Sequence, residues 1–190
     1  METLILLALA FGVVGICWYA ATIYNGLVGL KNDIEKAWAN IDILLKQRHD
    51  ELPKLIEVCK GYMNYERNTL QKITQARAMY QQAVSIDQKA QADQSMNTAV
   101  RGLFAVAENY PDLKANQNFL QLQKRITELE NQIADRREFY NDSVNSYNIR
   151  IQELPDTLVA AMMQLTPKPM FKVDAAEKAD VSVGFAAATQ

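Results

Sequence analysis

Histidine and cysteine are nearly missing from this sequence, whose 190 residues include one histidine, His49, and two cysteines, Cys17 and Cys59. A helical di-iron site needs two Glu-x-x-His pairs, and two cysteines cannot build a disulfide framework. The sequence also contains no Gly-rich phosphate loop and no G-x-S-x-G or Walker-type motif. We therefore predict that the protein is not an enzyme and has no catalytic residues, no metal site and no cofactor.

Glycine, proline and an excess of positive charge are scarce as well. Seven glycines and five prolines favour long helices over turn-rich β structure. Twenty lysines and arginines stand against 22 aspartates and glutamates, so the net charge is -2. Because nucleic-acid-binding proteins carry a basic excess, we expect no nucleic-acid partner.

A long apolar run fills the interval between Glu2 and Lys31, where no charged residue occurs. Residues 3–23 would form a helix of about 31 Å, which matches a hydrocarbon core of about 30 Å. No lysine or arginine precedes the run, although a cleaved signal peptide would carry one. We predict that residues 1–24 form an uncleaved transmembrane anchor in the lipid bilayer. Because cations follow the anchor and none precedes it, the remaining chain is expected in the cytoplasm.

The predicted anchor carries small residues at helical spacing. On one helix face they would let a second backbone approach closely, so we predict a homo-oligomer held partly through the anchor. Small residues are also common in membrane helices, and composition alone is the competing interpretation. The candidate membrane packing stripe consists of Ala8, Gly12, Gly15, Thr22, Gly26 and Gly29.

Apolar residues then repeat at alternating spacings of four and three, as in a coiled coil. One such seam runs through residues 34–84, with a single extra step of four. Pro53 lies inside it, and the pattern leaves open whether this proline kinks one helix or starts another. Ser85 and Gln88 have the spacing of a capping box for a helix that ends near residue 107. After a break at residues 109–112, the last long helix is expected over residues 113–154.

These patterns together predict an all-α protein. Residues 1–24 are expected to form the transmembrane helix, and residues 25–155 are expected to form long, coiled-coil-like helices that pack as a bundle. Residues 156–190 are expected to contain a short helix over 157–165 and an extended tail. Scattered apolar residues of this tail, Phe171 among them, are expected to pack against the bundle.

Charged residues occupy or adjoin the predicted seams, where apolar residues are expected. One hypothesis is an interior network of arginines and carboxylates that fixes the helix register. Two alternatives stay open: each charged head reaches water past its packed stem, or the groups line a ligand pocket. The candidate interior polar network consists of Arg48, Glu66, Arg77, Glu108, Glu130 and Arg137.

Three ordered stretches closely resemble the LemA family of bacterial membrane proteins. They are RHDELPKLIEVCKGY (48–62), ENYPDLKANQNFLQLQ (108–123) and REFYNDSVNSYN (137–148). The resemblance covers the anchor, the helices and the tail. It implies a single-pass protein of the bacterial inner membrane, in which residues 25–155 form a cytoplasmic, up-and-down-like four-helix bundle. It brings no agreed activity and no ligand residues. Gln47, Glu51, Lys54, Cys59 and Tyr65 depart from the family pattern without affecting the expected fold.

Three classes of function are compatible with these features. The first is a membrane-anchored scaffold or self-assembling structural protein. The second is a regulatory adaptor with a membrane-protein partner, such as a protease or signalling protein. The third is a small-ligand sensor that uses the buried polar groups. The size of the purified particle distinguishes the first class from the second, and a co-purifying small molecule would identify the third.

Overall fold

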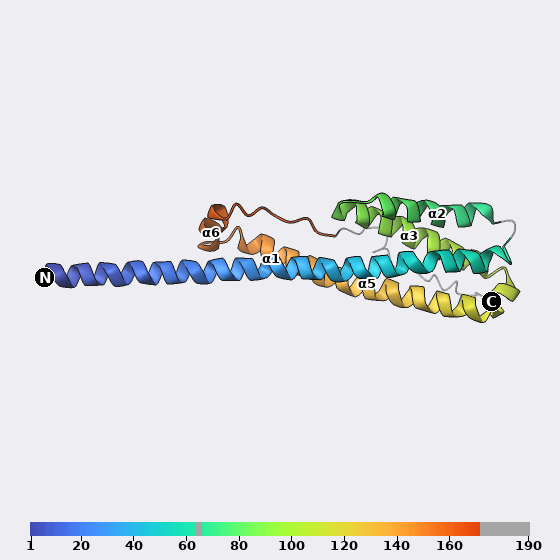
Figure 1. The fold of residues 1–190 in the computed structure, drawn as a ribbon, viewed down its shortest axis with the longest axis horizontal. Helices are drawn as coiled ribbons and strands as arrows, with labels where there is room; N and C mark the ends of the chain where they lie inside the picture. The colour runs from blue at the N-terminus through green and yellow to red at the C-terminus, as the bar shows by residue number, and fades with distance from the viewer. Residues whose placement is uncertain (64–65, 172–190) are drawn as a thin grey trace, which may run out of the picture.

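The structure is a computed structural model that describes residues 1–63 and 66–171; the tail beyond Phe171 lies outside the described residues. The described residues form six helices in order: α1 (Glu2–Lys60), α2 (Arg67–Gln82), α3 (Ile86–Ala107), α4 (Pro111–Ala115), α5 (Gln117–Arg150) and α6 (Asp156–Met162). In Figure 1, α1, α2, α3 and α5 alternate in direction, and the N-terminal part of α1 extends beyond the others. The prediction of an all-α chain with a long apolar N-terminal helix and packed helices is confirmed.

Helix α1 combines two environments in 59 residues, a length of about 88 Å. Residues 2–19 of this helix are all exposed, and its first buried side chain is Ile23. None of its most apolar stretch is buried against the rest of the chain. Such a bare apolar helix suggests a single-pass membrane anchor, because the core helix of a soluble protein would be covered.

Pro53 lies inside α1, which neither ends nor restarts there. The missing proline N–H removes one helical hydrogen bond, while Leu52 and Leu55 on either side are completely buried. The helix ends instead at Lys60, and the seam predicted through residues 34–84 therefore belongs to two helices. The spacing did not reveal this break, because two antiparallel helices that face one core carry the same periodicity as a single long helix.

The remaining boundaries follow from capping. The Ser85 hydroxyl accepts from the Gln88 N–H at 3.2 Å and the Gln88 side chain accepts from the Ser85 N–H at 3.1 Å, which confirms the capping box. The last long helix begins later than predicted, because the Asn116 side chain caps two backbone N–H groups. It also ends earlier, at Arg150, and α6 ends at Met162 rather than at residue 165.

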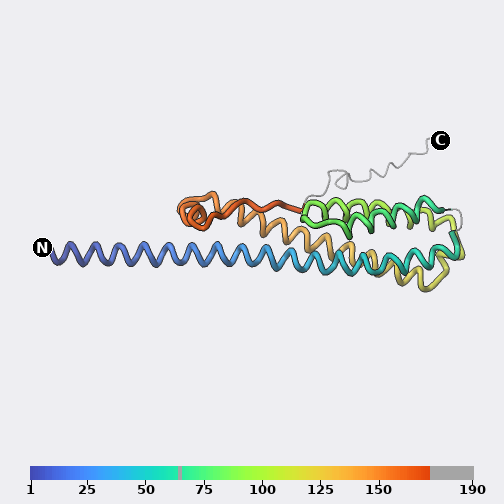
Figure 2. The backbone as a smooth tube through the Cα atoms, turned by 45° about the horizontal axis from the view of Figure 1, so that its top comes forward, coloured from blue at the N-terminus to red at the C-terminus, as the bar shows by residue number. Residues whose placement is uncertain are grey.

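The core has two parts along the long axis. Far from the anchor, buried side chains of α1, α2, α3, α4 and α5 pack together, among them Leu52, Ile73 and Leu103. Nearer the anchor, α1 and α5 pack with α6 and with the end of the described tail, including Phe171. Figure 2 shows this tail running back along the bundle from α6. The expected packing of Phe171 is confirmed, since this ring is 1% exposed.

Candidate functional site: an interior charge cluster and a tail strap

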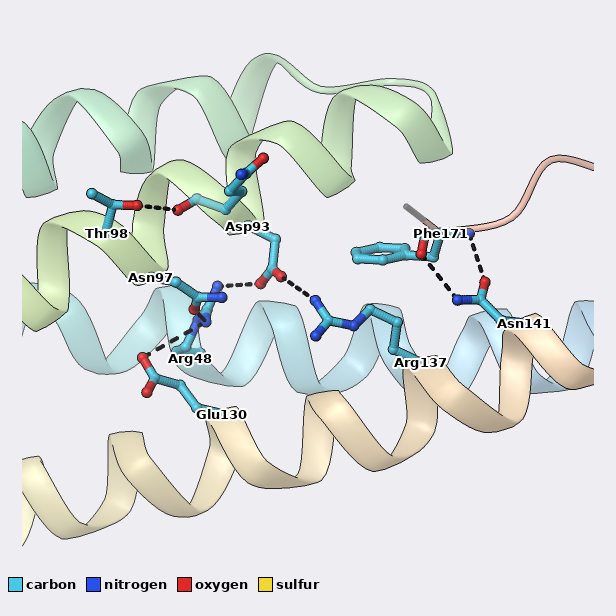
Figure 3. Close-up of polar contacts among 9 residues, drawn as sticks. Arg48, Asp93, Asn97, Thr98, Glu130, Arg137, Asn141 and Phe171 are labelled. Carbon is cyan, nitrogen blue, oxygen red and sulfur yellow. Dashed lines mark hydrogen bonds and ion pairs between the residues drawn. The ribbon is translucent and has the colours of Figure 1, made fainter. Parts of the chain in front are cut away.

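Arg48 is a buried cation in the middle of the bundle. Its position on the apolar seam of α1 turns the side chain inward, and the residue is 3% exposed. Its guanidinium donates to Asp93 and Asn97 of α3 and lies 4.0 Å from the Glu130 carboxylate of α5. Figure 3 shows these groups converging from three helices. A planar guanidinium with several donors suits such a multivalent contact.

Asp93 links this group to a second arginine. One carboxylate oxygen accepts from Arg48, and the other lies 3.7 Å from Nη1 of Arg137 on α5. The side chain of Asp93 is 1% exposed, and that of Arg137 is 17% exposed. We call Arg48, Asp93, Asn97, Glu130 and Arg137 the interior charge cluster. Its two cations and two anions balance, which is the condition under which buried charges are tolerated.

Only part of the candidate polar network lies in this cluster. Arg48, Glu130 and Arg137 come together, whereas Glu66 lies 3.4 Å from the Tyr110 hydroxyl and Glu108 pairs with Lys114. The Nε of Arg77 is buried without a hydrogen-bond partner among the described residues, and the charge of Arg77 acts on His49. These three residues therefore stand apart from the interior charge cluster.

Asp93 and Asn97, which complete the cluster, were not among the predicted residues. The signal for Asp93 is nevertheless in the sequence, since Asp93, Met96, Val100 and Leu103 follow the same alternating spacing used for the other seams. A charge at the first of these positions sits on the inner face of α3. Asn97 follows Asp93 by one helical turn and thus faces the same neighbours.

His49 lies beside the cluster and is 8% exposed. Its ring packs against that of Tyr80 with centroids 5.0 Å apart and planes tilted by 37°. Burial, and secondarily the charge of Arg77, lower the pKa of His49 below 6.5, while burial raises the pKa of Tyr80 to about 12. Both groups are therefore neutral at pH 7. The space next to them has a volume of about 10 Å³, close to the minimum for one water molecule.

Residues 166–171, which we call the tail strap, lie along α5 in extended form. Asn141 donates to the Phe171 carbonyl at 3.1 Å and accepts from the Phe171 N–H at 2.8 Å. Asn148 makes the same pair of bonds with Lys168, at 2.9 and 2.8 Å. The neighbouring Tyr140 and Tyr147 hydroxyls donate to strap carbonyls at 3.0 and 3.4 Å. Side chains of α5 thereby satisfy strap backbone groups that would otherwise lose water.

The spacing of these contacts makes the rise of a helix, in α5, agree with the rise of an extended chain, in the tail strap. The Tyr-Asn pairs at 140–141 and 147–148 are seven residues apart, which is about 10.5 Å along a helix. Their strap partners Lys168 and Phe171 are three residues apart, which is about 9–10 Å in an extended chain. Two turns of α5 thus correspond to three residues of the strap. The strap also covers the cluster, because Arg137 lies 5.7 Å from the Phe171 ring centre.

The candidate membrane packing stripe does not lie in one environment. Gly12 and Gly15 face open space on the bare part of α1, as Gly29 does further along. Ala8 and Thr22 are exposed as well, whereas Gly26 is half-buried. A Cβ at Gly26 would lie 2.9 Å from the Arg150 guanidinium. Gly26 therefore makes room for α5 of the same chain.

The sequence matches the profile of the LemA family over residues 37–185. Protein LemA of Metamycoplasma hominis is 31% identical over 159 residues, which is 83% of this chain and 72% of that protein. Magnetosome protein MamQ of Magnetospirillum gryphiswaldense is 20% identical over 78% of this chain and 65% of its own length. Magnetosome protein MamQ 2 of Paramagnetospirillum magneticum is 36% identical over 34% of this chain and 24% of its own length. With a family profile that spans most of its length, this chain belongs to the LemA family.

Proposed function

We propose that this protein is a scaffold of the bacterial inner membrane: a self-associating helical bundle, held by one transmembrane helix, that faces the cytoplasm. The observation that carries the proposal is the continuity of α1, which runs from the bare apolar segment to the far end of the bundle. Because α1 passes from the anchor into the bundle without a loop, the direction of the anchor helix sets the direction of the bundle. A rigid rod of this kind is suited to placing partners at a fixed distance from the membrane.

The side of the bundle formed by α1 and α5 offers a surface for self-association. A groove between these helices is lined by Asn40, Ile43, Leu44, Gln132, Asp135 and Arg136. Ile43 is 57% exposed there, and Phe139, one turn further along α5, is 58% exposed. Large exposed apolar side chains beside a groove are typical of protein contacts.

A non-enzymatic role fits the character of the interior charge cluster. Its charges balance one another, and the adjoining space of about 10 Å³ admits no small-molecule ligand. A ligand site would instead need a concave volume of about 300 Å³ or more. The cluster is better suited to fixing the register of α1, α3 and α5.

Particle size in membranes tests the scaffold. The full-length protein would be cross-linked in native membranes and then sized in mild detergent, as wild type and as Gly12→Leu/Gly15→Leu. We expect the wild type to form a large homo-oligomer and the variant a smaller particle, because leucine blocks close approach of two helices.

The matched control introduces two leucines on the opposite helix face. Ala10→Leu/Ala21→Leu places them about 200° and 220° around the helix from Ala8, at about 100° per residue. This control should keep the wild-type size. Equal sizes for all three proteins would refute association through the stripe. A monomeric wild type would refute the scaffold and favour the adaptor with a membrane-protein partner.

A further inference from the structure

One apolar surface is not explained by the bundle core. Leu154, Leu158 and Met162 are 78%, 64% and 86% exposed, respectively. Leu158 and Met162 are four residues apart on α6 and so share one face of that helix, and Leu154 lies in the turn just before it. The opposite side of α6 is covered, since Ala160 is 3% exposed and belongs to the core shared with α1 and α5. We call these three exposed residues the α6 stripe.

The α6 stripe lies at the level where α1 leaves the bundle. Ala160 and Ile151 share one buried cluster with Ile23 and Leu27, the first two buried residues of α1. Figure 1 shows α6 at the end of the bundle nearest the bare part of α1. In Figure 2 its coil is seen nearly end-on, so α6 lies across α1 rather than along it. A helix that crosses the anchor lies roughly parallel to the membrane plane.

Charge is depleted in the same place. Between Glu153 and Lys168 the only charged residue is Asp156. Its carboxylate accepts from Nε of Arg150 at 2.5 Å, and this pair leaves no net charge on the surface of α6. On α1 at this level, Tyr24 is 49% exposed and Tyr19 is 53% exposed, as expected for aromatic residues at a headgroup interface.

From these observations we propose that α6 rests in the interface of the bilayer that holds the anchor, with the α6 stripe inserted among lipid chains. The proposal rests on the membrane anchoring of α1 and adds a second apolar surface beside the exposed one of that helix. Apolar area supplies the attraction, as in helices that lie in the membrane plane. Contact at two points, the anchor and α6, fixes the tilt and rotation of the bundle on the membrane, which one helix alone leaves free.

Spin labels in the full-length protein test the contact. The Cys17→Ser background leaves Cys59 as the remaining native cysteine. Cys59 is buried, and burial raises the pKa of its thiol to about 11, so this thiol reacts poorly with the label. Leu158→Cys and Met162→Cys would each be labelled in phosphatidylcholine vesicles. Accessibility to oxygen, which concentrates in lipid, is then compared with accessibility to a water-soluble nickel complex.

Two control positions give the reference ratios for lipid and for water. Gly12→Cys reports the anchor, and Val84→Cys reports an apolar residue that is 90% exposed at the turn between α2 and α3. At Leu158→Cys and Met162→Cys we expect an oxygen-to-nickel ratio several-fold above that of Val84→Cys and below that of Gly12→Cys, because Gly12 lies near the middle of the predicted span and α6 at its edge. The ratio should not change when phosphatidylglycerol is added, because the α6 stripe is uncharged.

Three outcomes would overturn the proposal. A lipid-like ratio at Gly12→Cys with water-like ratios on α6 would refute the α6 contact and leave the anchor standing. A water-like ratio at Gly12→Cys would refute the anchor itself, and with it the proposed function. Spin–spin broadening at Leu158→Cys that disappears on dilution with unlabelled protein would identify a second copy, rather than lipid, as the occupant.

Discussion

The contact between Arg48 and Asp93 should couple the stability of α1 and α3 more strongly than any surface ion pair in this chain. Both side chains are almost fully buried, at 4% and 1% exposed. Removing one partner of such a pair typically costs about 3–5 kcal/mol, because the other charge stays in low dielectric. We expect losses of this size for Arg48→Met and for Asp93→Leu.

The structure refines this magnitude for Arg48→Met. Arg137 remains 3.7 Å from the Asp93 carboxylate, an attraction of about 4.5 kcal/mol at an effective dielectric of about 20. The loss should therefore fall near the lower end of the range, at about 3 kcal/mol. The double variant, Arg48→Met/Asp93→Leu, places apolar groups on both sides. It should be more stable than the sum of the single losses predicts, with a coupling of about 2 kcal/mol or more.

Urea titration of the full-length protein in detergent measures these losses, with Trp38 as a reporter because its ring packs 6.0 Å from Phe171. The matched control is Lys46→Met/Asp50→Leu, whose ion pair lies on the same helix with side chains 74% and 56% exposed. Each control change should stay within about 0.5 kcal/mol. Losses for the Arg48 and Asp93 variants that add without coupling would refute an interior pair that holds α1 to α3.

Three further predictions concern pH, the tail strap and topology. Burial lowers the pKa of His49 below its unfolded value of 6.5, so the unfolded chain binds more protons and the free energy of unfolding should fall as pH drops below about 6.5. In denaturant titrations at about pH 7.5 and 5.5, His49→Leu should lose part of this pH dependence. An unchanged pH dependence in His49→Leu would contradict the lowered pKa of His49. Asn141→Ala and Asn148→Ala should each lower the free energy of unfolding by about 1–3 kcal/mol and speed hydrogen exchange of the strap amides. The control Asn145→Ala, at an exposed position of α5, should leave this exchange unchanged, and equal effects of all three variants would refute specific binding of the tail strap by Asn141 and Asn148. A reporter fused after Gln190 should resist protease added outside intact cells. Digestion of the reporter would contradict the proposed cytoplasmic orientation.

Local signals in the sequence determined the chemical character of each segment. The uncharged run through residues 3–23 predicted a helix of membrane length whatever the rest of the chain did, because its length and composition suffice. The capping box at Ser85 and Gln88 likewise predicted where α3 begins, since its hydrogen bonds join residues three apart. The inward side of each long helix followed from spacing alone.

Only the tertiary structure decided which of these surfaces meet. The seam through residues 34–84 reads the same for one kinked helix and for two antiparallel ones, so the break after Lys60 could not be located from periodicity. Which charges become partners depends on the axial stagger of α1, α3 and α5. That stagger brings Arg48, Asp93 and Arg137 together and leaves Glu66 at the far end of the bundle.

The tail strap shows both contributions in one feature. The Tyr-Asn pairs seven residues apart and the prolines of the tail are visible in the sequence, and each indicates a local geometry, helical in one case and extended in the other. Their partnership is not local, because it needs α6 to turn the chain back along α5. Hydrogen bonds between residues 20 and 30 positions apart form only after packing has set the two segments side by side, which is why sequence reasoning reached the segments and not their contact.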